Sequence, residues 1–225
     1  MNTLDGFINI NGDGISAIEF IFLTAMLTLL PSLVVMTTSF TRYVISLSFL
    51  RNALGTQQTP PNMVLVGIAM FLTLFTMGPT IDQINQQAYT PYVNGEIEQA
   101  EFFTRASVPL KDYMLHQTEM TSLELFCELS QTELPEGEIS SLAEELPLRV
   151  VTPAFITSEL KKAFQIGFYL YIPFLLIDVI VSSTLMSMGM IMLPPAMIST
   201  PFKLLLFITI NGWELLFSTL VQGIR

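Results

Sequence analysis

The sequence predicts an all-α membrane protein, with four long hydrophobic helices in hairpins and a small helical domain outside the membrane. Hydrophobic residues make up 51% of the 225 positions and charged residues only 12%. An apolar stretch of about 18 or more residues is typical of a membrane-spanning helix. Four such stretches occur, at residues 17–40, 63–81, 164–186 and 202–221. The acidic residues gather mainly between the second and third stretches.

The first two apolar stretches define an expected N-terminal hairpin, residues 1–81. The link between them, Thr41–Asn62, contains Arg42 and Arg51 and no acidic residue. Because basic residues in short loops favour the cytoplasmic side, we expect the link inside and both termini outside. Residues 1–16 contain no basic residue, so we interpret the first stretch as a retained segment and not as a signal peptide.

Residues 82–163 are expected to form an acidic, mostly helical domain on the outer side, which is periplasmic in a bacterium. Thr121 and Ser141 each precede a glutamate by three residues at the start of an apolar pattern. This is the capping-box arrangement, so we expect helices to begin there. Thr152–Pro153 predicts another helix start, with proline at the first helical position. That helix is expected to continue directly into the third apolar stretch.

Residues 164–225 form the expected C-terminal hairpin, which contains ionisable residues in unusual places. Asp178 and Glu214 lie within apolar stretches. A charge at the centre of a bilayer costs about 2.5–3.5 kcal/mol on insertion scales, so such residues usually face protein or a water-filled cavity. Hydrogen bonding to neighbours is the simpler interpretation, and a proton or ion path is the alternative. Glu159 and Lys203, near the starts of the third and fourth stretches, are candidates for a charge pair.

Motifs that carry enzymatic chemistry are missing from the sequence. It contains no P-loop, GxGxxG, HExxH or GxSxG pattern and no cluster of cysteine and histidine. We therefore expect a protein that is not an enzyme and that holds no cofactor and no metal.

The most unusual stretch is MSMGMIMLPPAM, between the third and fourth apolar stretches. Methionine alternates with other residues at Met186, Met188, Met190 and Met192, while Gly189 and two prolines predict a loop. Methionine fills irregular space in protein cores, thioethers bind Cu(I), and apolar constrictions can gate pores. The residues alone leave packing, metal binding and gating open.

Two long segments resemble the signatures of the FliP family, the export-gate subunits of flagellar type III secretion. They are SFTRYVISLSFLRNALGTQQTPPN at residues 39–62 and the stretch from TSELKKAFQIGFYLYIPFLLIDVIV to TINGW at residues 157–213. The resemblance implies a homopentamer that assembles with FliQ- and FliR-type subunits into a helical cone. That cone would be the entry pore for unfolded flagellar proteins, at the bacterial inner membrane in the flagellar basal body.

The resemblance also implies roles for particular residues. Met190, Ile191 and Met192 would form a gasket at the constriction, flanked by Met186 and Met188, and Glu159 and Lys203 would form a charge pair between neighbouring subunits. No nucleic acid is expected as a partner. A subunit of a virulence-type injectisome remains an alternative, as does a conventional ion, solute or Cu(I) transporter.

Overall fold

The computed structural model describes residues 9–10, 13–14, 17–135, 137–190 and 192–224, and they are mainly helical. Two compact units are present, Met1–Met36 and Thr37–Arg225. The first contains a two-stranded antiparallel pair, β1 (Asn9–Ile10) and β2 (Asp13–Gly14), and most of helix α1 (Ala17–Thr37). The second contains the remaining helices: α2 (Phe40–Leu54), α3 (Asn62–Ile84), the π-helix η1 (Asn85–Tyr89), α4 (Thr90–Val93), α5 (Gln99–Gln117), α6 (Met120–Leu129), α7 (Ile139–Glu145), α8 (Leu148–Ser187), α9 (Pro195–Thr209) and α10 (Gly212–Gln222).

The hydrophobic helices have the length that the sequence predicts. Within the described residues, two continuous helical stretches are long and apolar enough to cross a membrane, Asn62–Val93 and Leu148–Ser187. Two bent pairs also qualify when each pair is taken together, at residues 31–54 and at residues 195–222, and the bend within the second pair is 65°. The protein is therefore an all-α membrane protein, as predicted, with up to four spans.

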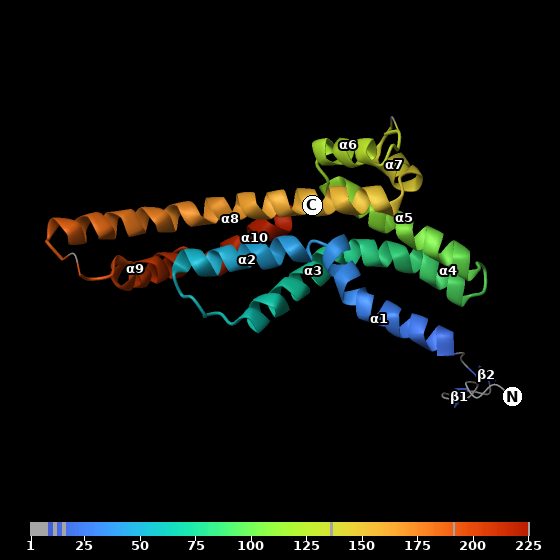
Figure 1. Cartoon of the computed structure of the whole chain (residues 1–225), viewed down its shortest axis with the longest axis horizontal. Helices are drawn as coiled ribbons and strands as arrows, with labels where there is room; N and C mark the ends of the chain where they lie inside the picture. Colours follow the sequence, from blue (N-terminus) through green and yellow to red (C-terminus); the bar gives the residue numbers. More distant parts are fainter. Residues whose placement is uncertain (1–8, 11–12, 15–16, 136, 191, 225) are drawn as a thin grey trace. The chain divides into compact units, whose positions relative to one another are not determined.

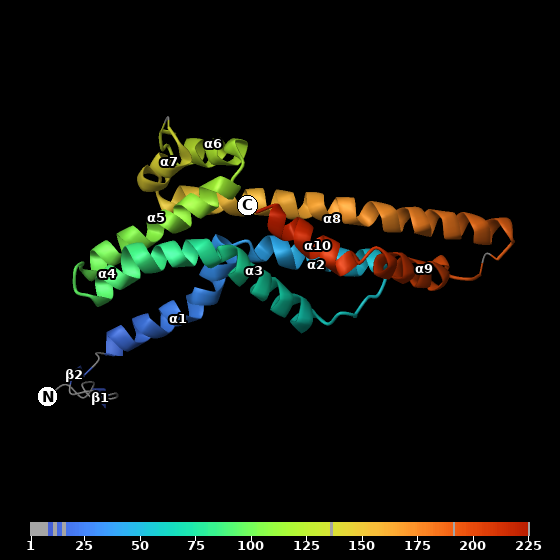
Figure 2. The same cartoon turned by 180° about the vertical axis from the view of Figure 1, so that it is seen from behind.

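The core of the second unit is the packing of α2 against α8. Tyr43, Leu47, Leu50 and Leu54 recur at helical spacing on one face of α2, and all four are buried. The helices approach closely at Gly167, where a Cβ atom would lie 2.4 Å from the ring of Phe49. Both views show α2 lying alongside α8, and α9 returning along α8 from the loop at its end (Figures 1 and 2).

Helices α5 and α6 pack against α8, and α7 packs against α5. These helices fall within residues 82–163, and their separation as a domain outside the membrane stays a prediction. Both capping-box predictions were wrong in position. The residue before α6 is Glu119 and the residue before α7 is Glu138, and neither side chain caps its helix. Thr121 and Ser141 therefore lie inside the first turns. Glu119 and Glu138 have extended backbone conformations (ψ 137° and 157°), and the helical conformation begins at the next residue in each case. The helices therefore begin earlier than predicted.

Three further expectations about helix boundaries need correction. Helix α8 begins at Leu148 after the extended Pro147, so Pro153 lies inside the helix and not at its start, although the predicted continuation into the third apolar stretch is confirmed. The expected basic link is largely the helix α2, and Arg42 is buried within it. The fourth apolar stretch divides into α9 and α10 at Asn211, whose φ of 51° takes it out of the right-handed helical region.

Candidate functional site

The methionine-rich segment forms the tip of the hairpin between α8 and α9. Helix α8 ends at Ser187, and the amide of Gly189 donates to the carbonyl of Met186 (3.0 Å) while the amide of Met190 donates to the carbonyl of Leu185 (3.0 Å). This pair of hydrogen bonds is the Schellman motif, which requires a left-handed residue just after the helix. Gly189 supplies it with a φ of 75°. The loop is therefore a specific turn.

The methionine side chains at this tip are exposed. The exposed fractions are 66% for Met186, 73% for Met188, 42% for Met190 and 98% for Met192. Ile191 lies outside the described residues. The loop closes at Pro194, which has an extended conformation, and Pro195 starts α9 at a position where its missing N–H is not needed. Among the described residues of a single chain, packing does not explain these four methionines, because each is at least 42% exposed.

A charged contact joins the two helices behind the loop. The ammonium group of Lys203 in α9 donates to the carboxylate of Asp178 in α8 (2.7 Å) and to the backbone carbonyl of Ala53 at the end of α2 (3.0 Å). The Lys203 side chain is only 7% exposed, whereas the Asp178 side chain is 35% exposed. Because Asp178 lies ten residues before Met188, the contact is about 15 Å along α8 from the loop. This contact therefore fixes how α9 returns along α8.

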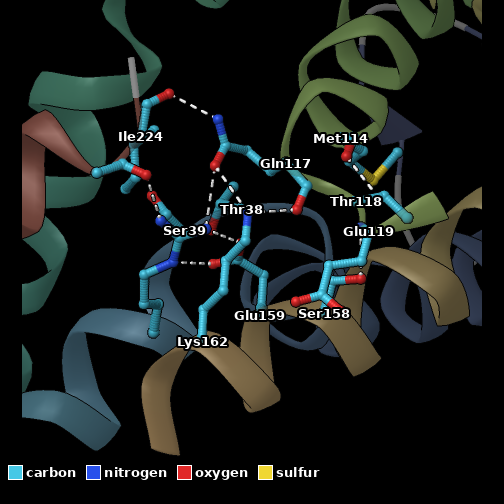
Figure 3. A network of polar contacts seen from close by, with 12 residues as sticks. Thr38, Ser39, Met114, Gln117, Thr118, Glu119, Ser158, Glu159, Lys162 and Ile224 are labelled. Carbon is cyan, nitrogen blue, oxygen red and sulfur yellow. Dashed lines mark hydrogen bonds and ion pairs between the residues drawn. The ribbon is translucent and has the colours of Figure 1, made fainter. Parts of the chain in front are cut away.

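A second, more deeply buried polar cluster lies at the other end of the second unit. Arg42 of α2 donates through Nε to Glu159 of α8 (2.9 Å) and through Nη2 to the same carboxylate and to Gln117 of α5 (3.1 Å). Arg42 and Glu159 are each 1% exposed. Lys162 donates to the backbone carbonyl of Gln117 (2.7 Å), and Figure 3 shows Glu159 and Lys162 approaching Gln117 from α8.

The structure gives Glu159 and Lys203 different partners from those expected. Within the described part of one chain, Glu159 pairs with Arg42 and Lys203 pairs with Asp178. The pairing of Glu159 with Lys203 between subunits stays a prediction. The hydrogen bond of Asp178 to a neighbour agrees with the simpler interpretation of this residue, while Glu214 lies exposed in the first turn of α10.

Arg42 and Gln117 were missed as members of a polar cluster. Arg42 was counted as a loop charge, although it lies beside Tyr43 on the face of α2 that also carries Ser39, Ser46 and Leu50. An arginine next to a buried apolar stripe indicates a buried polar cluster, because a buried charge needs a hydrogen-bonding or charged partner. Its partner lies 117 residues further along the chain, and no local pattern identifies it.

The residues of this chain do not suggest a metal centre. Within the described ranges, no group of three or more histidine, cysteine, aspartate or glutamate residues is close enough to hold an ion. The exposed thioethers of the loop are soft ligands, and they keep the Cu(I) hypothesis testable.

Taken together, these features define a helical membrane protein whose hairpin carries a turn of exposed methionines. The sequence model of the FliP family matches residues 23–220, which is most of the chain. The chain belongs to the FliP family. It is 49% identical over 212 residues to the flagellar biosynthetic protein FliP of Aquifex aeolicus, covering 94% of this chain and 87% of that protein.

Two further relatives support the same family assignment. The flagellar biosynthetic protein FliP of Bacillus subtilis is 46% identical over 208 residues, covering 92% of each chain. That of Caulobacter vibrioides is 48% identical over 223 residues, covering 97% of this chain and 82% of the relative. The resemblance seen in the two sequence segments is thus confirmed over almost the whole length.

Proposed function

We propose that this protein is a core subunit of the flagellar type III export gate and that its methionine loop seals the pore. Membership of the FliP family makes it a component of the flagellar export apparatus. The proposed role is structural and not enzymatic. The proposed location is the bacterial inner membrane at the basal body, with unfolded export substrates passing through the pore.

The observation that carries the gate proposal is the exposed methionine turn. Met188 and Met192 place large apolar side chains at the tip of a hairpin whose backbone is held by the Schellman motif. Several copies around an axis would bring such tips together. Methionine has three rotatable bonds and a polarisable sulfur, so a ring of these side chains can exclude water and ions and still repack around a peptide.

Assembly into a homo-oligomer is the second part of the proposal, with a pentamer and FliQ- and FliR-type partners as the expected composition. Large apolar side chains are exposed on several helices of the second unit, including Phe71 and Phe75 of α3 and Phe168 and Tyr169 of α8. Extensive exposed apolar surface is typical of contact with lipid or with other subunits. Export energy would come from the proton-motive force and a separate ATPase.

The experiment is a measurement of ion leak across the inner membrane of cells that make the whole gate complex. Replacing Met190 and Met192 with glycine should raise the leak severalfold, because the apolar bulk at the seal is lost. Replacing both with leucine is the matched control, and the leak should stay near the wild-type level because the bulk remains. Glycine variants that assemble normally without any increased leak would contradict the gate.

A triple leucine variant separates the gate from Cu(I) handling. Leucine removes the thioether ligands, so a Cu(I) protein would lose stoichiometric metal binding when Met188, Met190 and Met192 are all replaced with leucine. A gasket would keep its seal and its export activity.

A further inference from the structure

The residues that follow α10 fold back onto the buried polar cluster. The backbone carbonyl of Gly223 accepts a hydrogen bond from Arg42 Nη1 (3.0 Å), and the carbonyl of Ile224 accepts one from Gln117 Nε2 (2.6 Å). Figure 3 shows the Gln117 side chain reaching to Ile224. Gln117 is 6% exposed and Ile224 is 7% exposed. The segment after α10 is therefore held by donors from α2 and α5.

These two contacts can open without leaving a buried charge alone. Arg42 Nε and Nη2 remain on the carboxylate of Glu159, and Gln117 still accepts a hydrogen bond from Arg42. The two acceptors that leave are neutral carbonyls, which can be satisfied by water once they are exposed. The net contribution of such a hydrogen bond to stability is modest, whereas leaving a buried charge unpaired costs more. The cluster is thus arranged for local release.

The other end of α10 is a bend that can act as a hinge. Asn211 has φ 51° and ψ 48°, in the left-handed region, and the axes of α9 and α10 differ there by 65°. Asparagine adopts this conformation more readily than most residues. Between the bend and the contacts at residues 223–224, α10 buries Leu216 and Leu220 in the core, so the docked position is favoured over the undocked one.

The end of α10 also forms a wall of a cavity. Val221 and Ile224 line a space of about 410 Å³ together with residues of α3 and α5, among them Thr76 and Tyr113. The hydroxyl group of Tyr113 is buried and has no hydrogen-bond partner in the described part of the chain. Movement of α10 would widen this space.

We infer that Gly223 and Ile224 form a latch with Arg42 and Gln117, which holds α10 in its docked position and whose release lets α10 move about Asn211. The latch is independent of the gate proposed above, because it involves neither the methionine loop nor a second subunit. Its effect is local opening of one helix, while the α2–α8 core stays folded.

The test is amide hydrogen exchange of the whole chain in detergent micelles, with Gln117→Glu as the variant. A glutamate carboxylate keeps the acceptor for Arg42 and lies near both Lys162 and the carboxylate of Glu159. In its ionised form it cannot donate to the carbonyl of Ile224 and repels it. We expect exchange of the α10 amides to become about tenfold faster, as the loss of one such hydrogen bond implies. Exchange in α8 should be unchanged.

Gln83→Glu is a control for added charge at the open side of the cavity, because Gln83 lines the same cavity, is exposed and takes no part in the latch. It should leave exchange in α10 within twofold of wild type. Unchanged exchange of α10 in Gln117→Glu would overturn the latch. So would a parallel rise in α8, which would mean that the contact holds the whole fold, or an equal rise in Gln83→Glu, which would mean that any added charge in the cavity loosens α10.

Discussion

At the scale of single residues, the backbone of Gly189 decides the shape of the methionine loop. Its φ of 75° is strained for any residue with a Cβ atom, although among the described residues beyond its chain neighbours a Cβ there would meet no atom within 4 Å. The cost of a substitution is therefore purely conformational. We expect Gly189→Ala to destabilise the loop by about 1–2 kcal/mol and to raise ion leak in the assembled gate.

A matched substitution tests this argument in the same chain. Gly67 in α3 also has open space around it, but its φ is not positive. Gly67→Ala should be neutral or stabilising, by up to about 1 kcal/mol, because alanine is the better helix former. Unfolding of both variants in detergent gives the comparison. Equal destabilisation by the two substitutions would contradict a conformational origin.

Another residue-scale prediction concerns Tyr113 in α5. Burial is the main cause that raises the pKa of its hydroxyl from 10.0 to about 12. The folded state therefore holds this proton more tightly than the unfolded state. The contribution to stability is complete below pH 10 and is lost as the pH rises from 10 through 12.

Tyr113→Phe should remove this alkaline loss. We expect the free energy of unfolding of the wild type to fall relative to the variant by up to about 2–3 kcal/mol between pH 9 and pH 12. Denaturant unfolding in detergent at a series of pH values measures the difference. Parallel pH profiles for the two proteins would show that the hydroxyl is not the responsible group.

At the scale of elements, the contact of Asp178 with Lys203 fixes α8 against α9 behind the loop. The two partners are unequally buried, with exposed side-chain fractions of 35% and 7%. Removing the carboxylate leaves an ammonium group in a nearly closed site, while removing the ammonium leaves a carboxylate that solvent can reach. We therefore expect Asp178→Asn to cost about 1–3 kcal/mol and Lys203→Met to cost less.

The measurement is the free energy of unfolding in detergent for each variant. The exposed pair of Glu101 and Arg105 is the control, with side-chain exposures of 50% and 45%. Breaking that pair with Glu101→Gln should change stability by no more than about 0.5 kcal/mol. A larger loss for Lys203→Met than for Asp178→Asn would contradict the order of burial as the explanation.

At the scale of the whole molecule, the sequence predicted what depends on local composition. The apolar stretches, the helices between the second and third of them and the loop at Gly189 and Pro194 were all predictable, because hydropathy and turn chemistry act over a few residues. The residues at which helices begin and end were harder to predict. The starts of α6 and α7 were missed because polar residues can either cap a helix or lie in its first turn.

Contacts between residues far apart in the chain could not be predicted from the sequence. Arg42 donates a hydrogen bond to Glu159, which lies 117 residues further along the chain, and Lys203 donates one to the carbonyl of Ala53, which lies 150 residues earlier. Only the packing of α2 against α8 and of α9 along them brings these groups together. The candidate methionines could be identified, but their exposure and the hydrogen bonds that shape their turn required the folded chain.

The length of α8 has a mechanical consequence. A helix of 40 residues extends about 60 Å, twice the thickness of the hydrocarbon layer. It packs against α5 and α6, and its last residue adjoins the methionine turn, so it can act as a lever between these helices and the turn. A tilt of about 5° at one end would displace the other by roughly 5 Å, which is about the width of a side chain. Pro173, about four turns from the tip, removes one backbone hydrogen bond and is the natural place for that lever to flex.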